Sequence, residues 1–289
     1  MTVEVEGRTL QVSSLDRVLW PATGTTKAHL LEHYLRVAPL LLPHLRDRPL
    51  TLHRFPEGVQ GKHFFQTRTP PHPPWLRTVT LSYPRTGKSF QAPVVDDLAG
   101  LVWAVNLTTI EVHPFLGTVD ALDRPTAMVL DLDPGAPAGM VQACRVGLLL
   151  RDGLAARGLR SYAKTSGGKG LHVYVPVRGT TYDDTKALAR ALASGLTHSR
   201  PDLVVDRMTK SLRAGKVLVD WSQNDAGKST VAPWSVRGHA VPTVSVPVTW
   251  EEVEQVAATG DPRPLWFTID DVADRPDLFA AVIEDRQVL

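Results

Sequence analysis

The sequence predicts an α/β protein, and two observations carry that prediction. Between residues 126 and 198, short apolar runs alternate with segments of helical periodicity, which predicts strands at 126–132, 160–165 and 171–177 and helices at 139–157 and 183–198. Residues 49–95 instead hold several short strand-like runs broken by turn residues, among them Pro70-Pro71-His72-Pro73-Pro74. We therefore expect an α/β unit preceded by a module of short strands.

The remaining elements follow in chain order. Residues 3–12 alternate across a Glu-Gly turn and predict a β-hairpin. Thr26 is a suitable N-cap for a helix whose apolar residues recur at helical spacing, and Pro39 and Pro43 should bend or end that helix. The pattern also predicts a short helix at 97–106, strands at 110–113 and 217–219, and a helical segment near 250–258.

Composition narrows the class of protein. The chain has 289 residues, enough for one large domain or two small ones, and its 43% hydrophobic and 21% charged residues are typical of a soluble globular protein. The single cysteine, Cys144, excludes an intrachain disulfide and is expected to be a small core residue in a reducing cytoplasm. Because no signal peptide and no run of 18 apolar residues is found, we expect no membrane insertion.

Charge is distributed unevenly along the chain. Residues 43–92 carry eight Lys/Arg against two Asp/Glu, with four histidines, whereas residues 249–289 carry three Arg against ten Asp/Glu. The basic stretch is a footprint for a polyanion, although a solvated basic face has the same composition. We expect an N-terminal α/β module at 1–120 with the basic surface and a second α/β module at 121–289, together forming one compact domain.

Asp131 and Asp133 stand at the end of the apolar run that begins at Ala127. In a strand, residues two apart share one face, so both carboxylates point the same way before Pro134-Gly135 stops the strand. Two neighbouring carboxylates repel, and a divalent cation such as Mg²⁺ or Mn²⁺ is the usual compensation. The bare pair is equally compatible with acids at the surface end of a strand.

A glycine-rich turn follows at residues 164–175. Its consecutive backbone N–H groups favour anions, and Ser166 and Lys169 add a hydroxyl donor and a positive charge for phosphate oxygens. His172 begins the next strand. Strands flank the turn on both sides, so it is not a Walker A motif, and an ordinary glycine hairpin remains the alternative.

A third apolar run ends in an aspartate at Asp220. Two-metal phosphoryl-transfer sites need carboxylates that converge from separate strands. Three such aspartates with a glycine anion turn favour this chemistry over a structural interpretation of each aspartate alone.

The N-terminal half offers a histidine and a basic aromatic segment. His113 ends a strand and could bond a sugar hydroxyl or a phosphate, although a lone strand histidine is more often structural. Arg54 and Lys62 precede the pair Phe64-Phe65. Because adjacent strand residues face opposite sides, one phenylalanine should be core and the other free to stack on a base, although this segment is also compatible with both rings in the core.

Together these motifs resemble the primase-polymerase domain of the bacterial ATP-dependent DNA ligase D of non-homologous end joining, within the archaeo-eukaryotic primase superfamily. The resemblance covers nearly the whole chain and is carried by residues 15–21, Lys27, 106–113, 130–135, 165–172, 219–224 and 230–237. It implies a primase-like fold with central mixed or antiparallel sheets and flanking helices.

The resemblance also implies an activity: a DNA-dependent nucleotidyltransferase that adds nucleotides, preferentially ribonucleotides, to primer 3′-hydroxyl ends at gaps and double-strand breaks. Two divalent ions, Mn²⁺ or Mg²⁺, would be held by the catalytic residues Asp131, Asp133 and Asp220. The implied nucleotide-binding residues are His113, Ser166, Gly167, Gly168, Lys169, His172, Arg213, Gln223 and Arg237. The implied DNA-binding residues are Arg17, Lys27, Arg54, Lys62, Phe64 and Phe65.

Arg17 and Lys27 would contact a 5′-phosphate; the family often has lysine at the first position, and arginine keeps the charge while adding a bidentate donor. The implied partners are DNA with 5′-phosphorylated ends or gaps, NTP or dNTP, Ku and an ATP-dependent DNA ligase, with no membrane. The implied location is the cytoplasm, in association with the nucleoid.

Four other functions compete with this prediction. A module that tethers DNA ends through a 5′-phosphate, with weak or incidental polymerase activity, would use the same cations. A Mn²⁺-dependent glycosyltransferase would explain Asp131 and Asp133 but not Asp220, and a replicative primase would start chains without a primer. A polymerase-β-like enzyme is excluded because in such enzymes the Gly-Ser element precedes the Asp-x-Asp pair, whereas in this chain the glycine turn follows it.

Overall fold

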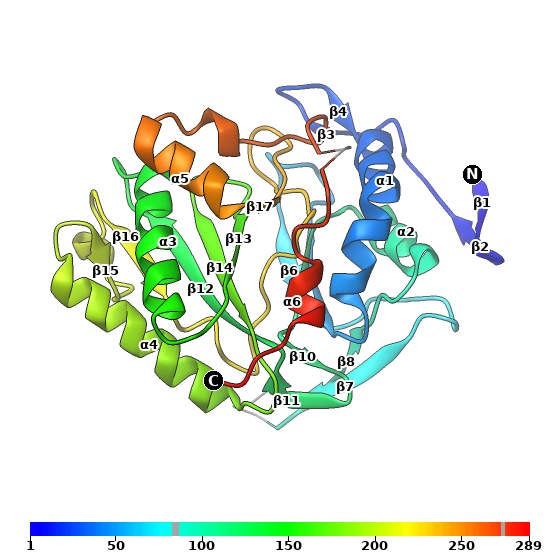
Figure 1. Ribbon diagram of the computed structural model, residues 1–289. Helices are drawn as coiled ribbons and strands as arrows, with labels where there is room; N and C mark the ends of the chain where they lie inside the picture. The colour runs from blue at the N-terminus through cyan, green and yellow to red at the C-terminus, as the bar shows by residue number, and fades with distance from the viewer. Residues whose placement is uncertain (83–86, 273–274) are drawn as a thin grey trace. The chain divides into compact units, whose positions relative to one another are not determined.

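The computed structural model describes residues 1–82, 87–272 and 275–289 (Figure 1). Arg85 of the basic stretch and Asp274 of the acidic tail lie outside the described residues. The chain divides into two compact units. Unit 1 comprises Met1–Asp120, Ser229–Ser245 and Thr268–Arg275, and unit 2 comprises Ala121–Lys228, Val246–Phe267 and Pro276–Leu289. Two late segments of the chain therefore belong to the first unit.

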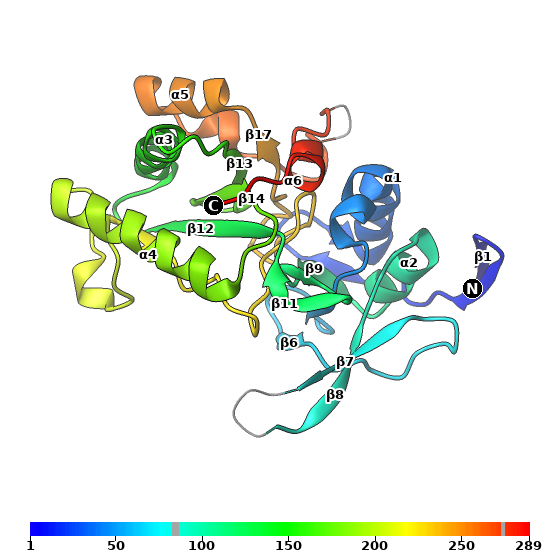
Figure 2. The ribbon, with the colours of Figure 1, turned by 60° about the horizontal axis from the view of Figure 1, so that its bottom comes forward.

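Unit 1 begins with the predicted hairpin of β1 (Thr2–Val5) and β2 (Arg8–Gln11), whose turn residues Glu6 and Gly7 both have positive φ. A small antiparallel pair follows, β3 (Val18–Trp20) and β4 (Thr25–Thr26). Helix α1 (Lys27–Leu45) is capped by Thr26, as predicted, and it continues through Pro39 and Pro43 instead of ending at either. Helix α2 (Leu98–Asn106) lies beside α1, and the two bury an apolar face (Figure 2).

Two further sheets complete unit 1. An antiparallel sheet has the order β6-β5-β9, with β6 at Phe64–Gln66, β5 at Leu50–Arg54 and β9 at Thr109–Pro114. Strands β7 (Thr78–Ser82) and β8 (Ser89–Pro93) form an extended two-stranded ribbon (Figure 2). Strand β10 (Gly117–Thr118) lies at the end of the first segment of this unit.

Unit 2 is built on a six-stranded sheet with the order β15-β16-β12-β14-β13-β17. Its strands are β12 (Ala127–Pro134), β13 (Tyr162–Thr165), β14 (Leu171–Pro176), β15 (Val204–Val205), β16 (Val217–Asp220) and β17 (Pro247–Val248). Only the β15–β16 pair is parallel. Strand β11 is Ala121–Pro125, and two 3₁₀ turns lie at Lys210–Leu212 and Arg263–Leu265.

Four helices accompany this sheet: α3 (Met140–Ala155), α4 (Tyr182–Ser199), α5 (Trp250–Thr259) and α6 (Ala280–Glu284). Helices α3 and α4 cover the central strands, and α5 lies against α3 (Figure 1). The predicted combination of mixed or antiparallel sheets with flanking helices is thus confirmed.

Strand β12 is buried on one side and carries charge on the other. Leu132 faces α3, because its Cδ1 lies 3.7 Å from the position that a Cβ on Gly147 of that helix would occupy. By strand alternation, Asp131 and Asp133 face the opposite side, and both are partly exposed. The sheet therefore presents these carboxylates on the face that α3 does not cover.

No helix within the described part of the chain is long and apolar enough to cross a membrane.

Candidate functional site

A row of four ionisable side chains crosses the sheet of unit 2. The register of the ladder pairs Asp220 of β16 with Asp131 of β12, Asp131 with His172 of β14, and His172 with Lys164 of β13. Directly paired residues point to the same face with Cβ atoms about 4.5–5.5 Å apart. The structure thus brings two of the three predicted catalytic aspartates side by side, and Asp133 lies on the same face two residues along β12.

Each aspartate of this group has a defined partner. Asp131 Oδ1 lies 3.3 Å from His172 Nε2. Asp133 forms an ion pair with Arg213. Asp220 accepts hydrogen bonds from the backbone N–H of Ser222 at 2.8 Å and from Gln223 Nε2 at 3.2 Å. His172, Arg213 and Gln223 were predicted as nucleotide-binding residues, and the structure places all three against the carboxylates.

The glycine turn lies between β13 and β14 of the same unit. Ser166 Oγ accepts hydrogen bonds from the N–H groups of Gly168 at 3.3 Å and Gly170 at 3.2 Å, while Lys169 is exposed. A Cβ on Gly170 would lie 2.4 Å from the carbonyl oxygen of Leu132, so only glycine allows the turn to pack this closely on β12. The turn is thereby held next to the aspartate strand.

Two basic residues of this site are absent from the sequence predictions. Lys164 is fully buried, and its place in the row opposite His172 depends on a strand register that no local pattern reveals. Lys228 donates to Ser222 Oγ at 2.6 Å, close in sequence to Asp220. Both lie in unit 2, Lys164 in the row itself and Lys228 bonded to a residue close in sequence to Asp220.

Unit 1 contains a second buried polar cluster, centred on Glu111 of β9. Its Oε2 lies 2.9 Å from His113 Nε2 and 3.1 Å from His53 Nδ1, and its Oε1 lies 3.2 Å from Arg237 Nε. The N–H of Gly238 also donates to Oε1 at 2.9 Å. His113 and Arg237 were predicted as nucleotide-binding residues; Glu111 and His53 were not.

Electrostatics in this cluster favour a charged glutamate beside neutral histidine. Burial acts to raise the pKa of Glu111, but hydrogen bonds from His113 and His53 and the nearby Arg237 charge outweigh it and hold that pKa well below its usual range. Burial lowers the pKa of His113, an effect that its hydrogen bond to Glu111 only partly offsets. The cluster thus carries one carboxylate charge beside one guanidinium charge.

The two phenylalanines of β6 lie differently from the prediction that one of them is core. Phe64 is 44% exposed and Phe65 is 61% exposed. The strand is only three residues long, and neither ring is buried. Phe65 stacks on His53 with ring centroids 3.8 Å apart, and Arg54 lies 5.5 Å from the Phe64 ring centroid. Both rings are therefore available to a ligand.

The predicted DNA-binding cations occupy two places in unit 1. Arg17 and Lys27 are neighbours through a backbone hydrogen bond, and the Lys27 ammonium donates to Ser13 O at 2.6 Å and Asn106 Oδ1 at 2.7 Å. Burial and then the Arg17 charge lower the pKa of Lys27 to about 8. Arg54 donates to Gln66 Oε1 at 2.7 Å, beside the phenylalanines, whereas Lys62 is exposed.

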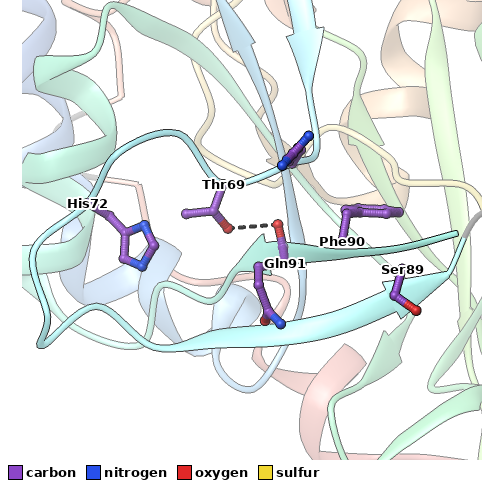
Figure 3. Close-up of a pocket in the computed structure, with 6 residues that line it drawn as sticks. Thr69, His72, Ser89, Phe90 and Gln91 are labelled. Carbon is purple, nitrogen blue, oxygen red and sulfur yellow. Dashed lines mark hydrogen bonds between the residues drawn. The ribbon is translucent and has the colours of Figure 1, made fainter.

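An open cavity of about 340 Å³ lies against the β7–β8 ribbon of unit 1. Figure 3 shows Thr69, His72, Ser89, Phe90 and Gln91 around it, with the hydroxyl of Thr69 bonded to the backbone of Gln91. Arg68 completes the lining, which contains no carboxylate. The cavity belongs to the basic stretch 43–92.

Two groups of side chains have donor sets suited to a metal. In unit 2, Asp131, Asp133 and Asp220 offer hard oxygen ligands on one face of a sheet, the type of ligand that Mg²⁺ and Mn²⁺ take. In unit 1, His53, Glu111 and His113 offer one ligand atom each, all within 4.8 Å of one another. Within the described residues, the group in unit 1 is the one whose three ligand atoms converge, whereas the three aspartates share a face of the sheet without such convergence.

Comparison with known proteins is consistent across the chain. The family model described as "LigD, primase-polymerase domain" matches residues 26–278. The multifunctional non-homologous end joining protein LigD of Mycolicibacterium smegmatis is 38% identical over 278 residues, which is 95% of this chain and 35% of the relative. The LigD protein of Mycobacterium bovis is 40% identical over 280 residues, covering 91% of this chain and 35% of the relative.

A solved structure, the polymerase domain from Mycobacterium tuberculosis ligase D in complex with DNA, matches with a TM-score of 0.86 and 36% identity. That match covers 96% of this chain and 99% of the solved one. The chain thus spans about a third of the length of the curated relatives but nearly all of the solved domain. These matches confirm the resemblance and the fold class predicted from the motifs.

Proposed function

The chain belongs to the LigD primase-polymerase domain family, a family of nucleotidyltransferases, and from this premise we propose that it extends primer 3′-hydroxyl ends on a DNA template at gaps and double-strand breaks. The observation that carries the proposal is the row in which Asp220 and Asp131 are paired across neighbouring strands, with Asp133 on the same face. Such carboxylates from separate strands are what nucleotidyl transfer with two metal ions requires.

The three aspartates fit a metal site. Asp131 and Asp220 are like charges in direct cross-strand pairing, an arrangement that is unfavourable without a cation. Two divalent ions, Mn²⁺ or Mg²⁺, would supply activation of the primer hydroxyl and neutralisation of phosphate charge when bound there. Asp220 would face the primer side, because it comes from a different strand than Asp131 and Asp133.

Contacts to a nucleotide are proposed for each unit separately. In unit 2, the N–H groups of Gly167 and Gly168, the Ser166 hydroxyl and the exposed Lys169 ammonium would bind the triphosphate, and His172, Arg213 and Gln223 would orient it. In unit 1, His113 and Arg237 would contact the sugar and the primer end, in a pocket that prefers ribonucleotides. These assignments rest on the motifs and on the contacts described above.

Template and downstream DNA are assigned to unit 1. The exposed rings of Phe64 and Phe65 would stack on bases, with Arg54 and Lys62 beside them. Arg17 and Lys27 would bind a 5′-phosphate, since two adjacent cations suit a doubly charged group. The related domain from Mycobacterium tuberculosis was solved with DNA, which supports this class of partner.

We propose that this chain works in the same repair process as its relatives. Those relatives are named as non-homologous end joining proteins, so the proposed work takes place on broken DNA in the cytoplasm, at the nucleoid, alongside Ku and an ATP-dependent DNA ligase. The hard oxygen ligands are compatible with a nucleotide as partner, and the basic surface is compatible with DNA.

Primer extension tests the proposal. The substrate is a gapped DNA with a 5′-phosphate, and ribo- and deoxynucleotides are supplied separately with Mn²⁺ or Mg²⁺. We expect template-directed addition that the Asp131→Ala/Asp133→Ala double variant loses and that Asp123→Asn, an exposed acid in β11 of the same unit, retains. Equal addition by the double variant would refute the assigned catalytic carboxylates.

A second function has one observation in its favour. The Arg17–Lys27 pair could serve a module that tethers DNA ends through the 5′-phosphate, with polymerisation incidental. Tight binding that depends on the 5′-phosphate, without nucleotide addition by the wild type under any metal condition, would favour that module over the polymerase.

A further inference from the structure

Glu111 occupies the centre of a second cross-strand row, in unit 1. The register pairs Phe65 of β6 with His53 of β5, and His53 with Glu111 of β9. His113 stands two residues after Glu111 and therefore shares its face of the strand. One carboxylate, 3% exposed, is thus in contact with two histidines and an arginine.

The carboxylate restricts which imidazole nitrogens carry hydrogen. An ionised glutamate only accepts, so the hydrogen bond of 2.9 Å between His113 Nε2 and Glu111 Oε2 requires a hydrogen on Nε2. His53 Nδ1 lies 3.1 Å from the same oxygen in an ion-pair contact, and His53 Nε2 lies 2.9 Å from His63 Nδ1. Neutral His113 keeps a lone pair on Nδ1. The His113 imidazole is therefore held in one defined tautomer.

A backbone N–H group also holds the Glu111 carboxylate in place. Gly238 donates its N–H to Oε1 at 2.9 Å, and a Cβ on Gly238 would lie 2.2 Å from the Phe55 ring. Only glycine can therefore bring this donor to the carboxylate. Together with Arg237 on the same oxygen, it fixes the glutamate so that Oε2 is left for the histidines.

We propose that Glu111 is a positioning residue that holds His113 in its Nε2–H tautomer, so that His113 Nδ1 is the acceptor for the 2′-hydroxyl of the incoming nucleotide. The inference rests on the proposed function, because it takes His113 as a nucleotide contact. A 2′-hydroxyl is a donor as well as an acceptor, and a site that prefers ribonucleotides needs an acceptor for it.

The same glutamate supports the stacking surface. His53 contacts Glu111 and lies under Phe65, with the two ring planes 18° apart, and Phe65 meets His113 edge-on with centroids 5.4 Å apart. One buried charge thereby positions a nucleotide contact and a template contact together. Loss of that charge should loosen both.

The first experiment is Glu111→Gln, a change that keeps the shape and removes the charge. We expect the ribo-to-deoxynucleotide ratio of kcat/KM to fall about tenfold, the effect of one lost hydrogen bond, mainly through a raised KM for the ribonucleotide. Glu254→Gln, an exposed glutamate of α5, is the matched control and should leave the ratio unchanged. An unchanged ratio in Glu111→Gln, with an active wild type, overturns the positioning role alone.

A pair of His113 variants keeps the test decisive if Glu111→Gln does not fold. Gln places its amide where Nε2 stands and lacks an acceptor at Nδ1, whereas Asn places its amide where Nδ1 stands. We expect His113→Gln to lose the ribonucleotide preference and His113→Asn to keep part of it. The reverse order overturns the assignment of Nδ1 as the acceptor.

Nitrogen-15 NMR of the imidazoles reads the tautomers without any activity. In the wild type, His113 should show Nε2–H, and Glu111→Gln should mix its two tautomers. His33→Gln, which alters a buried histidine of the same unit bonded to Trp234 O, should not disturb them. A failure of polymerisation leaves this measurement intact, so it separates this inference from the proposed function.

Metal binding is the competing outcome, because the same three side chains could ligate an ion. Elemental analysis in the Asp131→Ala/Asp133→Ala background, which removes the other candidate site, should find no metal bound to the chain. If one equivalent of metal is found and His53→Gln abolishes it, the cluster is a metal centre and the positioning role of Glu111 is overturned.

Discussion

Asp220 and Asp131 are direct cross-strand partners in the β12–β16 ladder, so two like charges lie on the same face within one strand spacing. Opposed carboxylates destabilise a sheet, and the chain carries this cost where the proposed ions would bind. Stability and activity should therefore change in opposite directions when one of the two charges is removed.

Asp220→Asn should be at least as stable as the wild type in metal-free buffer, with a gain of up to about 1 kcal/mol in free energy of unfolding. It should lose nucleotide addition and most of the stabilisation that Mn²⁺ gives the wild type. Urea unfolding with and without Mn²⁺ measures both effects, with Asp123→Asn as the control. A clear loss of stability in metal-free buffer would show that Asp220 has a structural role.

Gly170→Ala should damage the glycine turn. The added Cβ would meet the Leu132 carbonyl oxygen at 2.4 Å, and Gly170 also donates to Ser166 Oγ. We expect a destabilisation of about 1–3 kcal/mol and a raised KM for the nucleotide. Gly195→Ala in α4, where the new Cβ meets open space, should instead stabilise the protein by about 0.5–1 kcal/mol. Equal behaviour of the two variants in thermal unfolding and steady-state kinetics would contradict the close packing of the turn.

Binding of a 5′-phosphate should weaken as pH rises. The pKa of Lys27 is lowered to about 8 by burial and then by Arg17, so its ammonium loses its proton at a lower pH than an ordinary lysine does. The ratio of affinities for DNA with and without a 5′-phosphate should therefore fall between pH 7 and pH 9.5, and a bound phosphate would move the midpoint upward. Lys27→Arg should hold the ratio constant over that range. A flat profile in the wild type would remove Lys27 from the phosphate contact.

Acid should destabilise the protein through His33. Burial lowers its pKa to about 4, so between pH 6.5 and pH 4 the unfolded chain binds a proton that the folded chain does not. Stability from this group is complete above the unfolded pKa and is lost as pH falls, by about 3 kcal/mol at pH 4. In His33→Gln, the urea unfolding midpoint should fall less steeply with decreasing pH than in the wild type. His198→Gln, at the exposed end of α4, should behave like the wild type.

The sequence predicts the elements better than the contacts between them. Alternation along β12 is enough to place Asp131 and Asp133 on one face, because a strand has only two faces. The pairing of Asp131 with Asp220 and His172 depends on the register of strands distant in sequence, which local pattern does not contain. Lys164 was missed for the same reason.

Glu111 was missed although a local pattern could have identified it. It stands two residues before His113 in an otherwise apolar strand, so the two must share a face, as the two aspartates of β12 do. The prediction that one of Phe64 and Phe65 is core was wrong: both rings are exposed, and the stacking of Phe65 on His53 does not bury its ring. The prolines of α1 likewise did not end the helix, which continues to Leu45.

The pairing of strands in the sheet sets the spacing of the side chains in the row from Asp220 to Lys164. Its four side chains come from four strands, so their separations are multiples of the strand spacing, about 4.8 Å, and no loop sets them. A side-chain substitution can remove one of these groups but cannot move the others. A shift of one residue in a strand would turn its charge to the opposite face, so errors at this site should be all-or-none rather than graded.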